Sequence, residues 1–363
     1  MTDVAIYMPS LRGGGTERAM LTLANGFAAR GVRTDLVLAL AEGPYLIDVA
    51  PAVRVVDLDS RRVSTSLPGL ARYLRREQPR AMLSALSHAN VIAAVAKGLS
   101  RGSTRLVVSE RTHVSQNLHR SGSLRDRAML PVMRFAYRNA DAIVAVSHGV
   151  ADDLRNAISV PKERIHVIYN PVVTPGLEGL ASAPIDHPWL RGGEPPVVLA
   201  AGRLTPAKDY PTLLRAFAKV RRQRDCRLVI LGEGELRHSL EMLIGDLGLG
   251  SCVQLPGFAD NPFAWMRHAA LFVLSSAWEG LPNVLIQAMA CGTPVISTDC
   301  PSGPREILED GKWGTLVPVA DADALSEAII ERLGETGPND PRVRASYFGV
   351  DRSLDSYLGL LLG

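Results

Sequence analysis

Short apolar runs rich in Val, Ile and Leu alternate with helical patterns along the whole chain, and this rhythm restricts the fold more than any other feature. Runs that are apolar at consecutive positions are typical of parallel strands covered by helices on both faces. The pattern therefore predicts an α/β protein with doubly wound parallel sheets. The predicted strands are 4–8, 34–40, 54–58, 81–86, 105–110 and 142–147 in the first half, and 196–202, 227–232, 253–257, 271–276 and 294–299 in the second.

A segment rich in proline and glycine separates the two halves. Six of the 24 prolines and four glycines stand between residues 170 and 197. This composition is typical of a connection between domains, and 363 residues is about the length of two domains. We therefore expect a first domain at 1–170, a linker at 171–196, a second domain at 197–340 and a terminal helical segment at 341–363.

The charge of the chain is distributed unevenly. Residues 1–180 carry 23 Lys and Arg against 15 Asp and Glu, a balance of +8, whereas the remainder carries 17 against 22, a balance of −5. A basic half is expected to meet an anionic partner, such as a nucleic acid, a phospholipid surface or a lipid phosphate. Aromatic residues make up only 5% of the chain and do not interleave with the basic residues, so we expect no nucleic acid.

Other classes of protein are disfavoured by patterns that the sequence lacks. No apolar run approaches the length of a membrane span, and the start, MTDVAIYMPS, lacks the basic flank of a secretory signal. The cysteines form no C-x-x-C pair, so we expect neither a zinc site nor a disulfide framework. We expect a cytoplasmic protein, with peripheral contact to the cytoplasmic face of a membrane as an open alternative. The four cysteines are Cys226, Cys252, Cys291 and Cys300.

A glycine-rich turn follows the first predicted strand. In LRGGGTER, residues 11–18, Gly14 and Gly15 let backbone amides approach an anionic ligand at the start of a helix. A dinucleotide-binding loop needs a third glycine where Arg18 stands, and Glu42 is a weak candidate for its ribose-binding acid. A tight turn without a ligand and an NAD-dependent oxidoreductase both stay open on this loop alone.

Two segments of the second half place charged side chains after predicted strands. GRLTPAK brings Arg203 and Lys208 to the carboxyl end of the strand at 196–202, where ligands of open α/β sheets bind. Two cations near a helix N-terminus oppose the helix dipole, which favours an anion such as a diphosphate between them. In AWEGLPNVLIQAMACGTP, Glu279 precedes a tight loop, and Gln287 lies about one turn into the following helix.

Together and in this order, the motifs resemble the retaining glycosyltransferases of family 4, which have the GT-B fold. They are the glycine-rich loop, G-R-L-x-x-x-K, L-G-x-G at 231–234 and E-G-L-P-N-V-x-x-x-A-M-A-C-G-T-P-V-I, and they span nearly the whole chain. The resemblance implies two Rossmann-like doubly wound domains with a cleft between them. It also implies that the first domain binds the acceptor, that the second binds the nucleotide sugar, and that the terminal helix crosses back to the first.

The resemblance assigns roles to residues of the second half. Arg203 and Lys208 match the pair that grips the donor diphosphate, with a UDP-sugar as the favoured donor. Glu279 matches the first acid of the family's E-x7-E motif, which holds the donor sugar. Gln287 replaces the second acid, and its amide is still able to bond a ribose hydroxyl. The backbone amides of one further segment complete the phosphate site, at Leu281, Pro282, Asn283 and Val284.

The resemblance also matches His113, in the segment SERTH, to a histidine that faces the donor sugar, although a structural histidine is the alternative. In the implied mechanism no residue forms a covalent intermediate. The acceptor hydroxyl attacks from the face that the diphosphate leaves, and a phosphate oxygen helps to take its proton. Catalysis then rests on positioning and on stabilising the diphosphate charge. We expect no metal and no cofactor, because the D-x-D at Asp57–Asp59 sits at a strand end.

Two basic segments of the first half are candidates for contact with a membrane-bound acceptor, such as a polyprenyl-linked sugar or another glycolipid. The alternative is that they are ordinary outward faces of domain helices, and Pro131 weakens the helix prediction for one of them. Their basic residues are Arg127, Arg134 and Arg138 in RDRAMLPVMRFAYRN, and Arg72, Arg75 and Arg76 in LARYLRREQP.

The residues and the resemblance together predict a retaining hexosyl- or N-acetylhexosaminyltransferase of bacterial surface polysaccharide or lipopolysaccharide synthesis. Three alternatives stay open. The first is a sugar-nucleotide epimerase or hydrolase of the same fold. The second, favoured by Gln287, is a non-catalytic subunit that binds a nucleotide sugar. The third is an NAD-dependent oxidoreductase, which Arg18 opposes.

Overall fold

The computed structural model describes residues 2–116, 124–334 and 339–363, without the side chains of 124–128. The chain divides into two units, of which the first comprises Met1–Pro171 and Val350–Gly363 and the second comprises Val172–Gly349. Residues 172–196, which the sequence assigned to a linker, group with the second unit. Of the terminal segment, residues 350–363 group with the first unit and residues 341–349 with the second.

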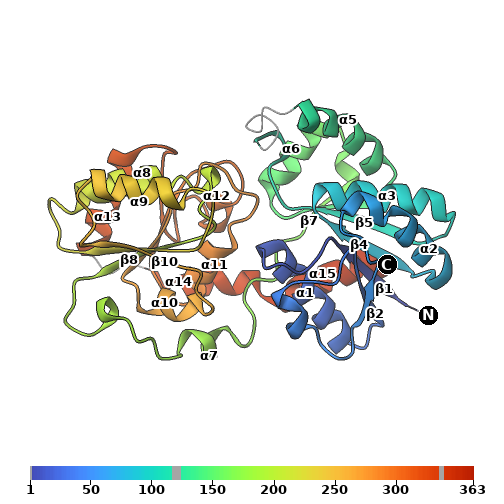
Figure 1. The fold of residues 1–363 in the computed structure, drawn as a ribbon, viewed down its shortest axis with the longest axis horizontal. Coiled ribbons are helices and arrows are strands. Elements are labelled where there is room, and N and C mark those ends of the chain that lie inside the picture. Colours follow the sequence, from blue (N-terminus) through green and yellow to red (C-terminus); the bar gives the residue numbers. More distant parts are fainter. Residues whose placement is uncertain (1, 117–123, 335–338) are drawn as a thin grey trace. The chain divides into compact units, whose positions relative to one another are not determined.

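A parallel sheet of seven strands forms the centre of the first unit, in the order β3-β2-β1-β4-β5-β6-β7 (Figure 1). β1, β2 and β4 are buried along their whole length, because helices cover both faces of the sheet. The order reverses between β1 and β4. The strands are β1 (Val4–Met8), β2 (Thr34–Leu38), β3 (Arg54–Asp57), β4 (Ala81–Ala85), β5 (Arg105–Glu110), β6 (Ala142–Ala145) and β7 (Ile165–Val167).

The helices α1 and α15 lie side by side on one face of this sheet, and α2 and α3 lie on the other (Figure 1). Apolar side chains of α1 and α15 share one core with the buried strands, and Arg30 of α1 pairs with Asp351 and Asp355 of α15. The helices of this unit are α1 (Gly15–Ala29), α2 (Leu67–Glu77), α3 (Ser87–Ser100), α5 (Leu124–Arg138), α6 (His148–Ile158) and α15 (Val350–Leu362), with 3-10 turns η1 (Pro44–Asp48), η2 (Val63–Ser66) and η3 (Lys162–Arg164).

The second unit is built around a parallel sheet of six strands, in the order β10-β9-β8-β11-β12-β13. Its order reverses between β8 and β11, so this sheet is doubly wound like the first. The strands are β8 (Val197–Ala201), β9 (Arg227–Leu231), β10 (Val253–Gly257), β11 (Leu271–Leu274), β12 (Val295–Thr298) and β13 (Thr315–Val317).

The helices α8, α9 and α13 cover one face of the second sheet, and α10, α11 and α14 cover the other (Figure 1). The first group packs on the buried strands through one large apolar core. The helices are α7 (Leu177–Ala181), α8 (Tyr210–Val220), α9 (Arg237–Asp246), α10 (Pro262–His268), α11 (Asn283–Ala290), α12 (Pro304–Ile307), α13 (Ala322–Gly334) and α14 (Pro341–Ala345), with 3-10 turns η4 (Pro188–Leu190), η5 (Pro206–Lys208) and η6 (Ser346–Phe348).

The prediction of two doubly wound parallel-sheet α/β domains is confirmed. Every predicted strand is present, and several end one or two residues early because the chain already turns into the following loop. Two strands were not predicted, β7 and β13, because each has only three residues and β7 carries an exposed His166. Pro131 lies inside α5 and does not end it.

The contact of α1 with α15 can be tested at Gly26. A Cβ added at this glycine would lie 2.6 Å from Cδ2 of the buried Leu354 on α15. We expect Gly26→Val to push α15 away and to lower the free energy of unfolding by about 1–3 kcal/mol. Gly98→Ala is the matched control, because a Cβ there meets nothing within 4 Å on α3; it should raise stability by up to about 1 kcal/mol. Thermal unfolding followed by circular dichroism compares the two, and equal midpoints would contradict the packing.

Candidate functional site

The second sheet has its topological switch point between β8 and β11. These strands are neighbours, but the chain leaves β8 toward β9 and leaves β11 toward β12, on the opposite side. Ligands of open α/β sheets bind beyond the carboxyl ends of the strands at such a point. Two hydrogen bonds join the loops that follow these strands: Ser275 Oγ donates to the Lys208 carbonyl at 2.7 Å, and the Ala277 amide donates to the Ala207 carbonyl at 2.8 Å.

A half-buried ion pair lies at this switch point. Lys208 Nζ donates to Glu279 Oε1 at 2.5 Å, and only 17% and 13% of the two side chains are exposed. Ser276 Oγ donates to the same carboxylate oxygen at 2.7 Å. The sequence placed Lys208 against an anionic ligand, and the structure shows that its first anionic partner is Glu279. An ammonium has three donors, so this pairing leaves donors of Lys208 for a further acceptor.

Arg203 supplies the net positive charge of the site. It follows β8 directly, its side chain is exposed, and it forms no ion pair with any residue that the structure describes. The charges of Lys208 and Glu279 compensate each other, so Arg203 is the group that gives the switch point its positive potential. A guanidinium presents several donors in a planar fork and suits the oxygens of a phosphate.

Two buried polar side chains, Tyr210 and Cys300, lie near the ion pair. Gly202 is required here, because a Cβ would lie 2.9 Å from Lys208 Cε and 3.0 Å from the Tyr210 hydroxyl. Burial raises the pKa of Tyr210, and the nearby charge of Glu279 adds to the effect. Burial, again with Glu279, raises the pKa of Cys300 to about 12. Both side chains are therefore neutral at physiological pH and add no charge near the ion pair.

The N-terminus of α11 follows the loop after β11. The helix begins at Asn283, after Leu281 and Pro282, so the positive end of its dipole lies at the carboxyl edge of the sheet. The sequence assigned backbone amides from Leu281 to Val284 to an anion site, but Pro282 has no N–H and contributes none. Gln287 is half-buried, four residues after Asn283 and thus on the same side of the helix.

In the first unit, the glycine-rich turn leads into α1, with Gly14 as its N-cap residue and Gly15 as its first residue. The residues around the turn pair with one another: Arg12 Nε donates to Glu42 Oε1 at 2.5 Å, and the Leu11 amide donates to the Glu42 carbonyl at 2.9 Å. Glu42, the weak candidate for a ribose-binding acid, is therefore engaged by Arg12. This pairing adds to the objection that Arg18 raises against the dinucleotide interpretation.

His113 lies beyond the carboxyl end of β5, and its side chain is 16% exposed. Its Nδ1 lies 3.3 Å from Oδ1 of the buried Asp153 of α6. Asp153 also accepts the Ser115 amide at 3.1 Å, which fixes the carboxylate. The distance from Nδ1 to Oδ1 places the Asp153 carboxylate within ion-pair range of the imidazole. This arrangement is compatible with the role that the resemblance implied and with a structural role.

Beside His113, the structure shows a buried polar cluster that the sequence did not predict. Glu110 accepts hydrogen bonds from Tyr137 Oη at 2.7 Å and from Ser87 Oγ at 2.9 Å, and burial raises the pKa of its carboxyl group. Arg111 is also buried, which lowers its pKa, and it donates to Ser109 Oγ at 3.3 Å. The polar run SERTH at the end of an apolar strand was the available signal, but the partners of Glu110 come from two other elements, α5 and α3.

The basic segments of the first half contain side chains with different surroundings. Arg134 donates to the Ala157 carbonyl at 3.0 Å, next to Phe135, whose side chain is 66% exposed. The side chain of Arg127 lies outside the described residues.

The carboxylate of Asp57, in the D-x-D segment, accepts hydrogen bonds from the backbone amides of Ala41 and Asp59. Within the described residues, no helix combines the length and the hydropathy that crossing a bilayer needs.

The structure therefore brings Arg203, Lys208, Glu279 and the start of α11 to one edge of the second unit, with Gln287 on that helix. It places Gly14, Gly15 and His113 at the carboxyl edge of the first sheet.

Comparison with known proteins gives matches over both halves of the chain. Residues 13–174 match the model described as Glycosyltransferase Family 4, and residues 195–335 match the model described as Glycosyl transferases group 1.

Full-length relatives are curated bacterial enzymes. One is the N-acetylgalactosamine-N,N'-diacetylbacillosaminyl-diphospho-undecaprenol 4-alpha-N-acetylgalactosaminyltransferase of Campylobacter jejuni, which is 28% identical over 100% of both chains. Another is the lipopolysaccharide core biosynthesis glycosyltransferase LpsE of Rhizobium meliloti, 28% identical over 96% of both. Among solved structures, HepE of Anabaena in complex with UDP and glucose matches with a TM-score of 0.80 at 20% identity, over 100% of both chains. That likeness concerns the fold.

The packing that holds the start of α11 can be tested at Gly303. This residue has φ +98°, and a Cβ there would lie 2.4 Å from Pro282 Cδ. Gly303→Ala should lower the free energy of unfolding by about 2–3 kcal/mol, because overpacking adds to the backbone strain. Gly311→Ala isolates the strain, since φ is +97° and its nearest contact is at 3.7 Å; it should cost about 1 kcal/mol. Chemical denaturation measures both, and equal losses would mean that the Pro282 contact has no weight.

Proposed function

The chain belongs to the glycosyltransferases, because residues 13–174 match the family 4 model and residues 195–335 match the group 1 model, and we propose that it transfers a sugar from a UDP-sugar to a lipid-linked acceptor with retention of the anomeric configuration. The observation that carries this proposal is the ion pair of Lys208 and Glu279 at the switch point, with Arg203 beside it in the same loop. Lys208 offers a cation for a phosphate, and Glu279 offers a carboxylate for sugar hydroxyls. The two groups are hydrogen-bonded to each other.

The donor diphosphate binds to Arg203 and Lys208 in this proposal. Arg203 contributes a planar fork, and Lys208 contributes the donors that Glu279 leaves unused. The N-terminal amides of α11 add the positive end of a helix dipole. These groups supply positive charge and donors without a metal ion, so we propose that donor binding needs none.

The sugar and the ribose bind on either side of the diphosphate. Glu279 is fixed by Lys208 and Ser276, and its other carboxylate oxygen accepts from hydroxyls of the donor sugar. Gln287 binds the ribose: its amide donates to one hydroxyl and accepts from another. The exchange of a carboxylate for an amide removes one negative charge beside the phosphates, and this change favours an anionic ligand.

Catalysis then depends on groups that are already in place before the donor binds. The ion pair and the hydrogen bond from Ser276 hold Lys208 and Glu279 in place, so little reorganisation is needed as charge develops on the leaving diphosphate. The acceptor hydroxyl attacks from the face that the diphosphate leaves, and a phosphate oxygen takes its proton. His113, whose imidazole lies beside Asp153, contacts the donor sugar.

The acceptor is a polyprenyl-linked or other membrane glycolipid in this proposal. The C. jejuni relative is named for an undecaprenol-linked substrate, and LpsE for the lipopolysaccharide core. The excess of basic residues in the first half, with Arg134 and the exposed Phe135 on α5, suits the surface of an anionic membrane. The enzyme then works at the cytoplasmic face of the inner membrane. In this proposal the glycine-rich turn, with Gly14 and Gly15, contributes to donor binding.

Donor binding tests the assignment of Lys208. Titration calorimetry in EDTA should show binding of UDP, and Lys208→Ala should weaken it about ten-fold or more, since a charge-assisted hydrogen bond is worth about 1.5–3 kcal/mol. Lys219→Ala is the matched control, because Lys219 on α8 pairs with the exposed Asp323. GDP, ADP and NAD are titrated in parallel. Binding of NAD alone, or equal UDP affinity in the three proteins, would overturn the donor site.

The reaction itself is tested by incubating the protein with UDP-sugars and a short-chain polyprenyl diphosphate sugar. We expect a glycosylated lipid whose new linkage has the anomeric configuration of the donor, as read from its proton coupling constant. Sugar release or conversion without the acceptor would indicate a hydrolase or an epimerase. UDP binding without turnover of any donor would indicate a non-catalytic subunit.

A further inference from the structure

The outermost strand of the first sheet has an open edge. β7 pairs with β6 on its inner side, and no strand among those described pairs with its outer side. The Ile168 amide donates to the Ala145 carbonyl at 3.0 Å, so it faces β6. Backbone groups alternate in direction along a parallel strand, which turns the N–H and C=O of Val167 and the C=O of Ile165 outward. The Ile165 N–H is already used by the Lys162 carbonyl.

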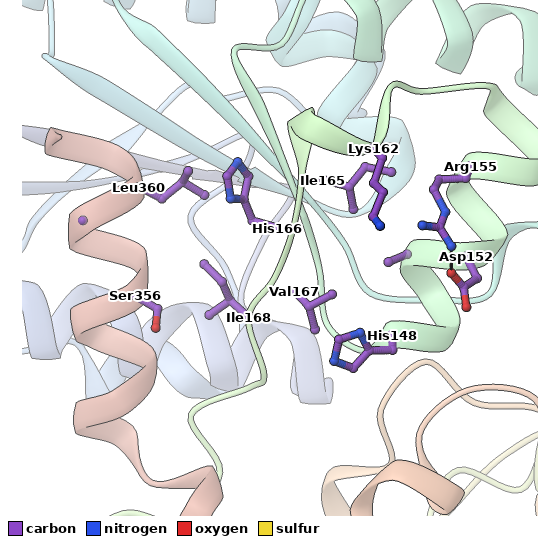
Figure 2. A pocket seen from close by; sticks show the side chains of 12 residues that line it. His148, Asp152, Arg155, Lys162, Ile165, His166, Val167, Ile168, Ser356 and Leu360 are labelled. Atoms are coloured by element: carbon purple, nitrogen blue, oxygen red, sulfur yellow. Dashed lines mark hydrogen bonds and ion pairs between the residues drawn. The ribbon is translucent and has the colours of Figure 1, made fainter.

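A groove of about 690 Å³ runs along this edge. Figure 2 shows that β7 forms its floor, with α6 as one wall and α15 as the other. Ile165 and Val167 project toward α6, whereas His166 and Ile168 project toward α15 (Figure 2). The remaining labelled lining of the two walls includes Arg155 and Lys162 on the α6 side and Ser356 and Leu360 on α15. A floor with backbone donors and acceptors between two side-chain walls is the form of site that binds an extended peptide.

The walls of the groove differ in chemistry. The α6 side carries Arg155 and Lys162, and its acid, Asp152, is paired with Arg155. The α15 side offers Ile168, Leu360 and the hydroxyl of Ser356. A second copy of this chain is a poor occupant, because a second β7, with the sequence Ile-His-Val, offers no carboxylate to Lys162.

We infer that this edge binds an extended segment of a partner protein in which acidic and apolar residues alternate. The segment pairs its backbone with Val167 and Ile165 as an added strand. Side chains of a strand alternate in direction, so its acidic residues face Lys162 while its apolar residues face Ile168 and Leu360. This site uses none of the residues assigned to the donor, and it is independent of the proposed transfer reaction.

Basic residues at a sheet edge also protect proteins from aggregation, and this simpler function predicts no ligand. The two functions differ in what the flanking walls do. A protective lysine needs no groove, whereas the edge of β7 lies in a groove with Lys162 on the α6 side and the apolar Ile168 and Leu360 on the α15 side. The experiment below separates them by binding.

The probe is a fluorescein-labelled ten-residue peptide that alternates Val and Glu, and its binding to the whole protein is followed by fluorescence anisotropy. We expect saturable binding that is at least about ten-fold tighter than that of the Val-Lys peptide of the same length. Val167→Pro removes the outward N–H without breaking the pairing with β6, and should weaken binding about ten-fold. Lys162→Glu should weaken it about five-fold. Arg72→Glu, the same charge change on an exposed part of α2, should leave it within two-fold.

Hydrogen exchange measured with and without the peptide identifies strand addition. We expect slower exchange of the Val167 amide in the complex. The thermal midpoint of Val167→Pro, compared with that of the unmodified chain, shows whether that variant is folded. Equal affinity for the Val-Glu and Val-Lys peptides, unchanged affinity in Lys162→Glu, or full competition by free glutamate would each overturn the inference and leave the edge as a protective feature or a plain anion site.

Discussion

Parallel strands that are buried on both faces can be joined only by crossings over those faces, and this constraint organises both units of the protein. The crossings run in opposite directions from β8 and from β11, so the two loops that follow these strands diverge at one edge of the sheet. Lys208 and Glu279 lie 71 residues apart in the chain, yet they meet there in a short ion pair. Their position follows from the winding of the sheet, because neither loop determines it alone.

The fold was predictable because its signal is repeated. The central strands are rich in consecutive Val, Ile, Leu and Ala, and a helix follows most of them, so a single ambiguous segment does not change the topology. β7 and β13 were missed because three-residue strands at a sheet edge need burial on only one side, and the sequence of β7, Ile-His-Val, has no apolar run. The assignment of 350–363 to the first unit depends on packing between α1 and α15. The hydrophobic periodicity of the sequence predicts a helix there but does not say which unit the helix packs on.

The chemistry of the site was predictable only in part. The types and spacing of Arg203, Lys208 and Glu279 were informative, because charged residues after buried strands reach the same edge. Their pairing was not, because it depends on which loop approaches which. The same holds for Glu42, which the structure pairs with Arg12, and for Glu110, whose hydrogen-bond partners come from two helices. Pro282 is different, because the sequence alone shows that a proline has no N–H and adds no donor to the anion site.

The return of the chain to its first unit has a consequence for biosynthesis. α15 supplies Leu354, Tyr357 and Leu361 to the core that lies over β1 and β4, but it is translated after the whole second unit. As the ribosome advances, the nascent first unit carries an uncovered apolar face on α1 for the time needed to make some 180 further residues. The second unit, by contrast, is continuous in sequence and completes its own core as it emerges. Vectorial synthesis therefore favours a folding order in which the second unit completes its core first and the first unit completes its core only when α15 has been made.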